Sequence, residues 1–174
     1  MELIVAELDI GSSEPARVAV ELARTREVLR LGPMTPVPTA PPSFVGAMNA
    51  GGQVLPVIDA SLLAFGVASM PSPGESGLLT WVLEHRGGRA IEVNCVLYVG
   101  RVLEVTRAED ALVSAAFAAA ATAGGGGSLV APLEVDIGEV QLLDVVALVQ
   151  RIARDVDEAR RRAFPAVLSG GPRA

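Results

Sequence analysis

The sequence contains no lysine, one cysteine, one histidine and six aromatic residues among its 174 positions. Without lysine it can form neither a Schiff base nor a phosphate-binding loop that ends in Gly-Lys. The single Cys95 cannot form a disulfide within the chain, and Cys95 with His85 supplies too few ligands for a zinc site. The composition therefore predicts no metal and no cofactor.

Positive charge is also scarce. Fourteen arginines face 20 acidic residues, which leaves a net charge of −6. Nucleic-acid binders need a basic surface and aromatic side chains on which bases stack, so binding to nucleic acid is not expected.

The residues that often carry catalysis have simpler explanations here. Cys95 lies among alternating apolar residues and is interpreted as a small buried side chain, and His85 precedes a turn. Asp59 and Asp144 stand where helix N-caps are expected, which explains them better than an acid–base pair does. The sequence therefore predicts that the protein is not an enzyme.

One long segment, residues 111–133, carries no charge. It consists largely of Ala and Gly, with four consecutive glycines from Gly124 and a proline at Pro132, so it would insert poorly into a bilayer. We interpret it as a flexible link in a soluble protein, with no direct membrane insertion. The opening Met1-Glu2-Leu3 lacks the basic region of a signal peptide, which favours a cytoplasmic location.

Apolar and polar residues alternate with a period of two through most of the chain, which is typical of half-buried strands. Eight or nine short strands are expected, including Leu3–Leu8, Val18–Leu22, Gln53–Ile58, Leu78–Glu84, Ile91–Cys95, Gly100–Val105, Leu129–Val135 and Val140–Leu142. Glycine-rich turns such as Arg86-Gly87-Gly88-Arg89 separate several of them. The fold class is therefore all-β, with barrels or a sandwich, few short helices and one C-terminal helix.

Helices are predicted at Pro41–Met48, Ala60–Phe65 and Val145–Phe164. Asp59 caps the second, which Gly66 ends, and Asp144 caps the third, which is expected to be the only long helix. Pro165 stops the third helix, so residues 1–164 are expected to form one domain and residues 165–174 a disordered tail.

A weak internal repeat relates residues 52–63 to residues 138–148. Each copy has a turn glycine, an apolar strand and an aspartate that caps a helix. The repeat suggests two similar halves within the domain.

Residues 31–58 and 60–74 contain no charged side chain. Proline-rich loops run over the surface, and the centres of protein interfaces are poor in charge. The segment is therefore a candidate contact surface, or else a rigid proline-stiffened connection without a partner.

The order of residues in this region resembles a known family. Thr25–Arg30 is followed by Met34-Thr35-Pro36-Val37-Pro38-Thr39-Ala40-Pro41-Pro42-Ser43-Phe44-Val45-Gly46-Ala47-Met48-Asn49 and then by Gly52-Gln53-Val54-Leu55-Pro56-Val57-Ile58-Asp59. This run resembles CheW, the bacterial chemotaxis coupling protein, without a gap from Glu27 to Asp59. The likeness extends more thinly over residues 2–150.

The resemblance implies two packed five-stranded SH3-like β-barrels. It also implies a non-catalytic cytoplasmic adaptor that binds the regulatory domain of a CheA-like histidine kinase and the cytoplasmic tip of chemoreceptors. Membrane association would then come only through the receptor arrays.

Carried over by position, the resemblance places Thr25, Glu27, Gly46, Asn49, Gly51 and Val102 at the receptor-facing groove. Gly46 is expected to allow close backbone approach and Gly52 a turn. Pro56 is expected at a strand edge or bulge, because a proline within a central strand loses a ladder hydrogen bond.

The chain departs from the family pattern at two places. Gly51 stands where the family usually has an arginine that could pair with a carboxylate such as Glu27, and Leu97-Tyr98 replaces an acidic pair. The alternatives are a divergent scaffold in a non-standard system, such as surface motility, that has lost kinase or ordinary receptor binding, and a small-ligand-binding barrel with a deep pocket.

Overall fold

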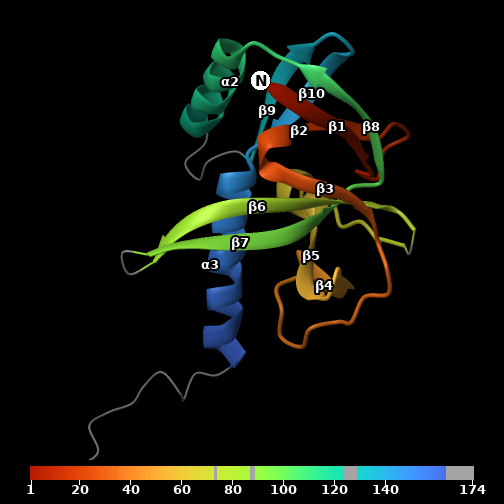
Figure 1. Ribbon diagram of the computed structural model, residues 1–174, viewed down its shortest axis with the longest axis vertical. Coiled ribbons are helices and arrows are strands. Elements are labelled where there is room, and N and C mark those ends of the chain that lie inside the picture. Colours follow the sequence, from red (N-terminus) through yellow and green to blue (C-terminus); the bar gives the residue numbers. More distant parts are fainter. Residues whose placement is uncertain (73, 87–88, 124–128, 164–174) are drawn as a thin grey trace, which may run out of the picture.

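The computed structural model describes residues 1–72, 74–86, 89–123 and 129–163. Its strands are β1 (Glu2–Leu8), β2 (Ala16–Glu21), β3 (Thr25–Arg30), β4 (Phe44–Ala50), β5 (Gln53–Asp59), β6 (Ser76–Arg86), β7 (Arg89–Tyr98), β8 (Arg101–Arg107), β9 (Val130–Val135) and β10 (Gly138–Leu143). Its helices are η1 (Leu22–Arg24), α1 (Ala60–Phe65), α2 (Asp110–Ala123) and α3 (Val145–Ala163). The mainly β fold with two five-stranded halves is as predicted (Figure 1).

The two sheets have the same internal arrangement. The first sheet has the order β8-β1-β2-β10-β9, and the second sheet has the order β3-β6-β7-β5-β4. In each, one strand of the internal repeat, β5 or β10, pairs antiparallel with an edge strand and parallel with its inner neighbour. The second sheet is built from five consecutive strands, whereas β1 and β2 must join β8–β10 to complete the first.

The main hydrophobic core lies between the two sheets. Val18 and Val20 from the first sheet, Ile58 and Leu97 from the second, and Leu148 from α3 are all fully buried within one cluster. The inner faces of both sheets and one side of α3 therefore bury their apolar side chains in one shared layer, which we call the seam. This burial stabilises the two halves only when they are packed together.

The two predicted aspartate caps are confirmed. The carboxylate of Asp59 accepts a hydrogen bond from the backbone N–H of Leu62 at 3.0 Å, and that of Asp144 accepts one from Ala147 at 2.9 Å. Gly66 closes α1 with a φ of 72°. α3 is described to Ala163, so its predicted last residue and the predicted tail, 165–174, lie outside the described residues.

The predicted helix at Pro41–Met48 is wrong. Residues 44–50 instead form β4, paired antiparallel with β5. Gly46 and Met48 are buried while Asn49 is exposed, so burial alternates as it does along a strand. The two prolines precede the strand and do not open a helix. With this strand and β3, the described residues form ten strands, where eight or nine were expected.

The flexible link predicted across the Ala/Gly segment is also wrong for residues 110–123, which form α2. Alanine has the highest helix propensity, and Val113 and Phe117 pack against the apolar face of the first sheet that holds Leu3 and Val140. α3 is therefore not the only long helix. Gly124–Gly127 lie outside the described residues.

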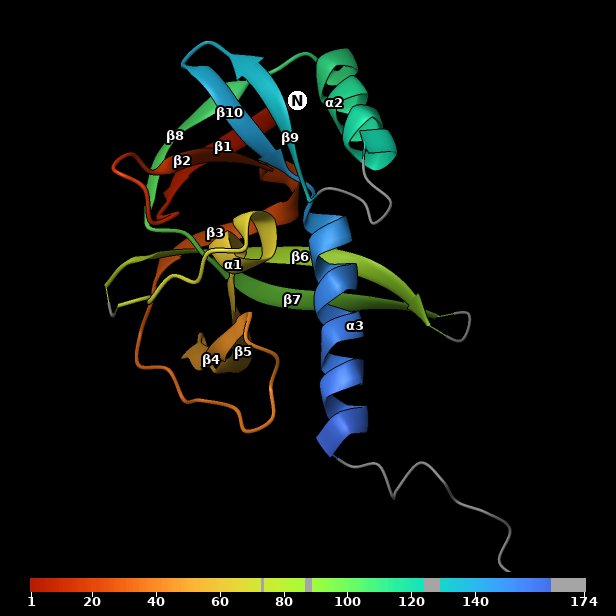
Figure 2. The ribbon, with the colours of Figure 1, turned by 180° about the vertical axis from the view of Figure 1, so that it is seen from behind.

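None of the helices in the described part of the chain is long and apolar enough to cross a membrane. Figure 2 shows α3 beginning beside the first sheet, crossing in front of β6 and β7 in this view, and continuing past them.

Gly46 allows a close approach of two backbone segments, as expected. The N–H and C=O of Thr35 exchange hydrogen bonds of 2.8 and 2.9 Å with Ala47. A Cβ at Gly46 would lie 2.8 Å from the carbonyl oxygen of Thr35. The substitution Gly46→Ala should lower the free energy of unfolding by about 1–3 kcal/mol, because this backbone has to move.

Gly32→Ala is the matched control, since a Cβ there would meet only the Met48 methyl at 4.0 Å. Urea unfolding followed by circular dichroism measures both variants. Equal midpoints for the two would contradict the close approach.

Val20→Asp should prevent folding, because Val20 is 0% exposed in the seam and a carboxylate there has no partner. A loss above about 4 kcal/mol is expected, comparable with the whole stability of a domain. Val28→Asp makes the same change at a side chain that is 46% exposed and should melt like the parent protein. Thermal melting of the two variants tests which side chains of the strand face the core. A normal melting curve for Val20→Asp would refute the inward orientation of Val20.

Candidate functional site

A groove of about 350 Å³ lies where the edges of the second sheet face each other without pairing. β3 is one edge strand and β4 is the other. The lining residues come from β3, β4, β5, β6 and the start of the 31–43 loop: Glu27, Leu29, Arg30, Gly32, Met48, Asn49, Ala50, Gly51, Gln53, Leu55 and Leu79. The free edges therefore produce an open, mostly uncharged depression.

Three of the six residues proposed by resemblance meet in this groove, namely Glu27, Asn49 and Gly51. Gly51 and Gly52 have φ angles of 58° and 85°, which suit a two-residue hairpin turn between β4 and β5. The side-chain oxygen of Asn49 accepts a hydrogen bond from the Gly52 N–H at 3.0 Å. The turn conformation expected of Gly52 is thus confirmed.

The other three lie elsewhere. The Thr25 hydroxyl donates to the carbonyl of Glu21 at 3.4 Å, at the start of β3. Gly46 packs on Thr35. Val102 belongs to β8 in the first sheet, where it pairs with Ala6 and packs against the seam.

The floor of the groove is rigid and apolar. Met48 and Leu55 are 5% and 6% exposed and belong to a cluster with Val57, Val96 and Tyr98. Burial raises the pKa of Tyr98, and the negative charge of Glu75 raises it further, so this phenol stays neutral at physiological pH.

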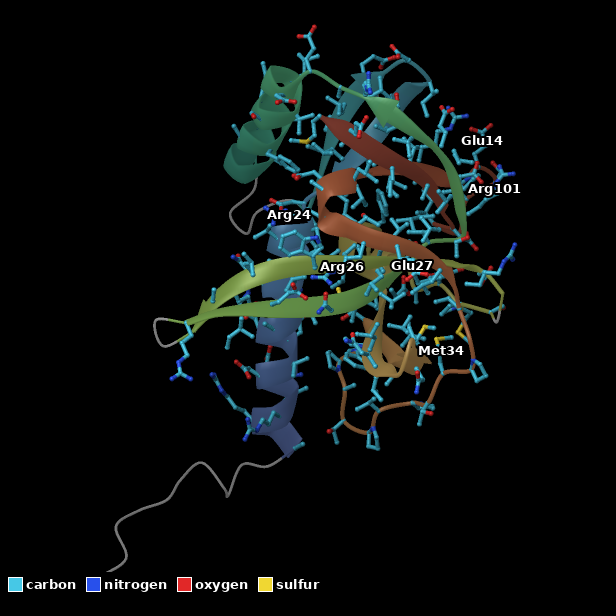
Figure 3. The ribbon with its side chains drawn as sticks, in the orientation of Figure 1. Glu14, Arg24, Arg26, Glu27, Met34 and Arg101 are labelled. Atoms are coloured by element: carbon cyan, nitrogen blue, oxygen red, sulfur yellow. The ribbon has the colours of Figure 1, made fainter. Side chains whose placement is uncertain are left out.

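Glu27 is the one carboxylate on the groove wall. In the described part of the chain its side chain makes no ion pair or hydrogen bond. The neighbouring arginines of β3 are engaged elsewhere, because Arg26 pairs with Glu92 and Arg30 donates to the carbonyl of Gly74. Figure 3 shows Glu27 beside Arg26 on the outer side of β3.

Pro56 does not lie in an edge strand, contrary to expectation. β5 lies between β4 and β7, but its parallel pairing with β7 begins at Val57. The proline therefore precedes the pairing with β7 by one residue, while it stands opposite Ala47 in the pairing with β4. Asp59 is 2% exposed and also accepts hydrogen bonds from the backbone and hydroxyl of Ser69, both at 2.8 Å, so its role is structural.

One surface feature was missed from the sequence. The guanidinium groups of Arg24 and Arg26 both lie over the ring of the chain's single tryptophan, Trp81, at 5.6 and 5.8 Å from the ring centre. The indole N–H of Trp81 donates to the carbonyl of Ala23 at 3.1 Å. Figure 3 shows Arg24 above Arg26, and Arg26 beside Glu27. Tryptophan and arginine are the residues most enriched at binding hot spots. The sequence did contain a signal for it, namely a large aromatic residue at an outward-facing position of the predicted strand Leu78–Glu84.

The described residues contain no group of three or more His, Cys, Asp or Glu side chains that could hold a metal ion. Cys95 is 3% exposed, as expected for a small buried side chain, and burial raises the pKa of its thiol. Its sulfur lies 3.3 Å from the Thr80 hydroxyl.

Comparison with known proteins agrees with this architecture. The CheW-like domain family matches residues 9–153. Among solved structures, the scaffolding protein TtCheW from Thermoanaerobacter tengcongensis is similar, with a TM-score of 0.59 and 17% sequence identity over 83% of this chain and 84% of that one. At that identity the likeness concerns the fold. No curated protein sequence matches the chain. The family match covers the groove, the second sheet and every strand of the first sheet except β1, and the chain is a member of the CheW-like domain family.

Proposed function

We propose that this protein is a non-catalytic, cytoplasmic chemotaxis-type adaptor that couples a CheA-like histidine kinase to chemoreceptor tips. The observation that carries the proposal is the family match across a fold whose groove collects Glu27, Asn49 and Gly51. In this assignment the groove receives the receptor tip, and a separate surface binds the regulatory domain of the kinase.

An adaptor of this kind acts by holding its two partners close to each other. A rigid body that binds two partners raises the effective concentration of each near the other. The shared seam between the sheets supports this role, because it holds the two halves as one unit. The uncharged segment adds exposed apolar surface, including Val37 at 41% and Val54 at 74% exposure.

A second candidate is a divergent scaffold that no longer binds an ordinary receptor tip. It is favoured by the groove itself, where Gly51 offers no side chain and Glu27 has no partner among the described residues. Such a protein would keep the kinase and use a different receptor.

Isothermal titration of the full chain with the isolated regulatory domain of the CheA-like kinase from the same cell tests the coupling role. Binding in the micromolar range or tighter is expected. Absence of heat at high concentration, with the protein folded, would contradict the adaptor function.

Gly51→Arg should strengthen binding to a chemoreceptor cytoplasmic tip by about threefold or more, through a charge pair with Glu27 that fixes the groove wall. A side chain has room there, since no atom lies within 4 Å of a Cβ built at Gly51. The φ of 58° imposes some strain. Gly51→Ala carries the same strain without the guanidinium and is the matched control.

Titration of the receptor tip against both variants measures the effect. If Gly51→Arg and Gly51→Ala bind equally, the missing arginine does not explain the divergence of this groove.

A further inference from the structure

Charge is distributed unevenly over the molecule. Residues 1–24 and 99–144, which build the first sheet and α2, carry twelve carboxylates and four arginines. α3 carries five arginines and three carboxylates. Figures 1 and 2 both show the first sheet and the end of α3 at opposite ends of the long axis. The molecule therefore has an acidic end and a basic end.

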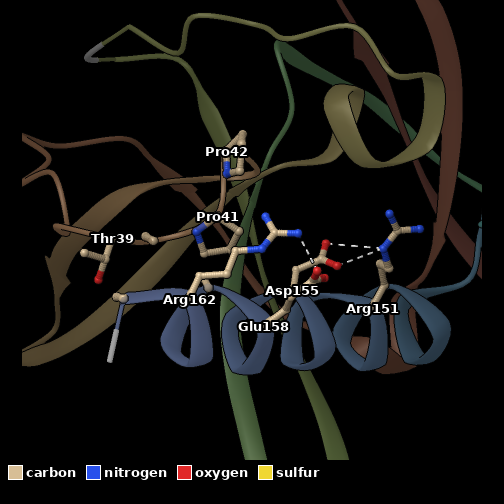
Figure 4. A pocket seen from close by; sticks show the side chains of 10 residues that line it. Thr39, Pro41, Pro42, Arg151, Asp155, Glu158 and Arg162 are labelled. Atoms are coloured by element: carbon tan, nitrogen blue, oxygen red, sulfur yellow. Dashed lines mark hydrogen bonds and ion pairs between the residues drawn. The ribbon is translucent and has the colours of Figure 1, made fainter. Parts of the chain in front are cut away.

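Two arginines of α3 already have partners. Arg151 donates to Asp155 at 3.1 Å and Arg162 pairs with Glu158. Figure 4 shows both pairs along one side of a depression of about 580 Å³ that the helix forms with the loop at Thr39–Pro42. These four side chains therefore form two ion pairs within the helix.

Of the remaining three arginines, Arg154 and Arg161 make up the basic face of α3, with the exposed Asp157 between them, and Arg160 faces the loop at residues 37–41. Arg154, Arg160 and Arg161 are exposed and make no ion pair within the described residues. Arg154 and Arg161 lie two turns apart and so share one side of the helix. This part of α3 extends past β6 and β7, which leaves the face accessible (Figure 2).

The acidic end has a matching concave surface. A hollow of about 460 Å³ is lined by β8, the start of β1 and the β9–β10 turn. Within the described residues, Arg107 is taken by Glu2 at 3.0 Å, while Glu104 and Asp136 have no ion pair. Val105, in the same lining, is 55% exposed.

The hairpin next to this hollow places like charges together. Glu134 and Glu139 are directly opposite in the β9–β10 register, an arrangement that destabilises a hairpin. Arg17 reaches this hairpin but donates to the backbone carbonyl of Ile137, at 3.0 Å. Positive charge from outside the chain would relieve this repulsion.

We propose that the basic face of α3 of one copy docks against the acidic hollow of a second copy of this chain. The protruding helix end and the concave, acidic hollow are complementary in charge and shape, and the chain itself supplies both. Because the two surfaces are different, the contact is head-to-tail and leaves one of each free for a further copy. The proposal does not depend on a kinase or a receptor.

Sedimentation velocity of the full chain over a range of concentrations tests the contact. At about 0.05 M salt, species larger than a monomer should grow with concentration, and at about 0.5 M salt they should dissociate, because the Debye length shortens. A monomer at every concentration and salt would overturn the proposal.

Paired charge reversals identify the surfaces. Arg154→Glu/Arg161→Glu and Glu104→Arg/Asp136→Arg should each be monomeric under conditions where the parent chain associates. Their equimolar mixture should associate again, because every contact between unlike copies then brings opposite charges together.

Arg89→Glu is the control, because it reverses the charge of an exposed arginine away from both surfaces. It should associate like the parent, and circular dichroism verifies that all variants fold. Association that survives both reversals, or a mixture that stays monomeric, would place the contact elsewhere and refute the proposal. Loss of association in the control alone would refute it as well.

Discussion

The apolar seam between the two sheets is the constraint on which the rest of the structure depends. Neither sheet covers its own inner face, and α3 supplies Val145, Leu148 and Val149 to the same cluster. Burial of this surface provides the largest favourable term in folding. The chain also crosses between halves, since β1 and β2 precede the second sheet and β8–β10 follow it. The two halves therefore behave as one rigid body, which is what an adaptor requires.

The groove is a consequence of how that body is built. Five strands wrap far enough to bury a core under Met48 and Leu55, but β3 and β4 remain separate edges. The Thr35 bridge to Ala47 and the glycine turn after β4 then shape the rim. Unpaired strand edges are a liability that proteins usually cover. In a CheW-like domain an edge left open in a depression is suited to a partner.

The parts of the fold that were predictable are those with a local cause. Asp59 and Asp144 each cap a helix three residues before the backbone N–H they bind, so the cap can be found in a short window of sequence. β4 and α2 were missed for opposite reasons. Prolines before Phe44 imitate a helix start, and the alanine-rich segment has no amphipathic period, so only its packing against Leu3 and Val140 shows what it is.

The sequence alone determined the strand period, the two capped helices, the repeated halves and, through the run from Glu27 to Asp59, the family. Tertiary structure decided which residues meet. Glu27 and Gly51 come to one groove, whereas Val102 goes to the other sheet and Trp81 to a surface beneath two arginines. The physical reason is that helix caps and the alternation of apolar residues in strands depend on residues close together in the chain. The groove and the charged ends of the molecule depend on the order in which the strands pair.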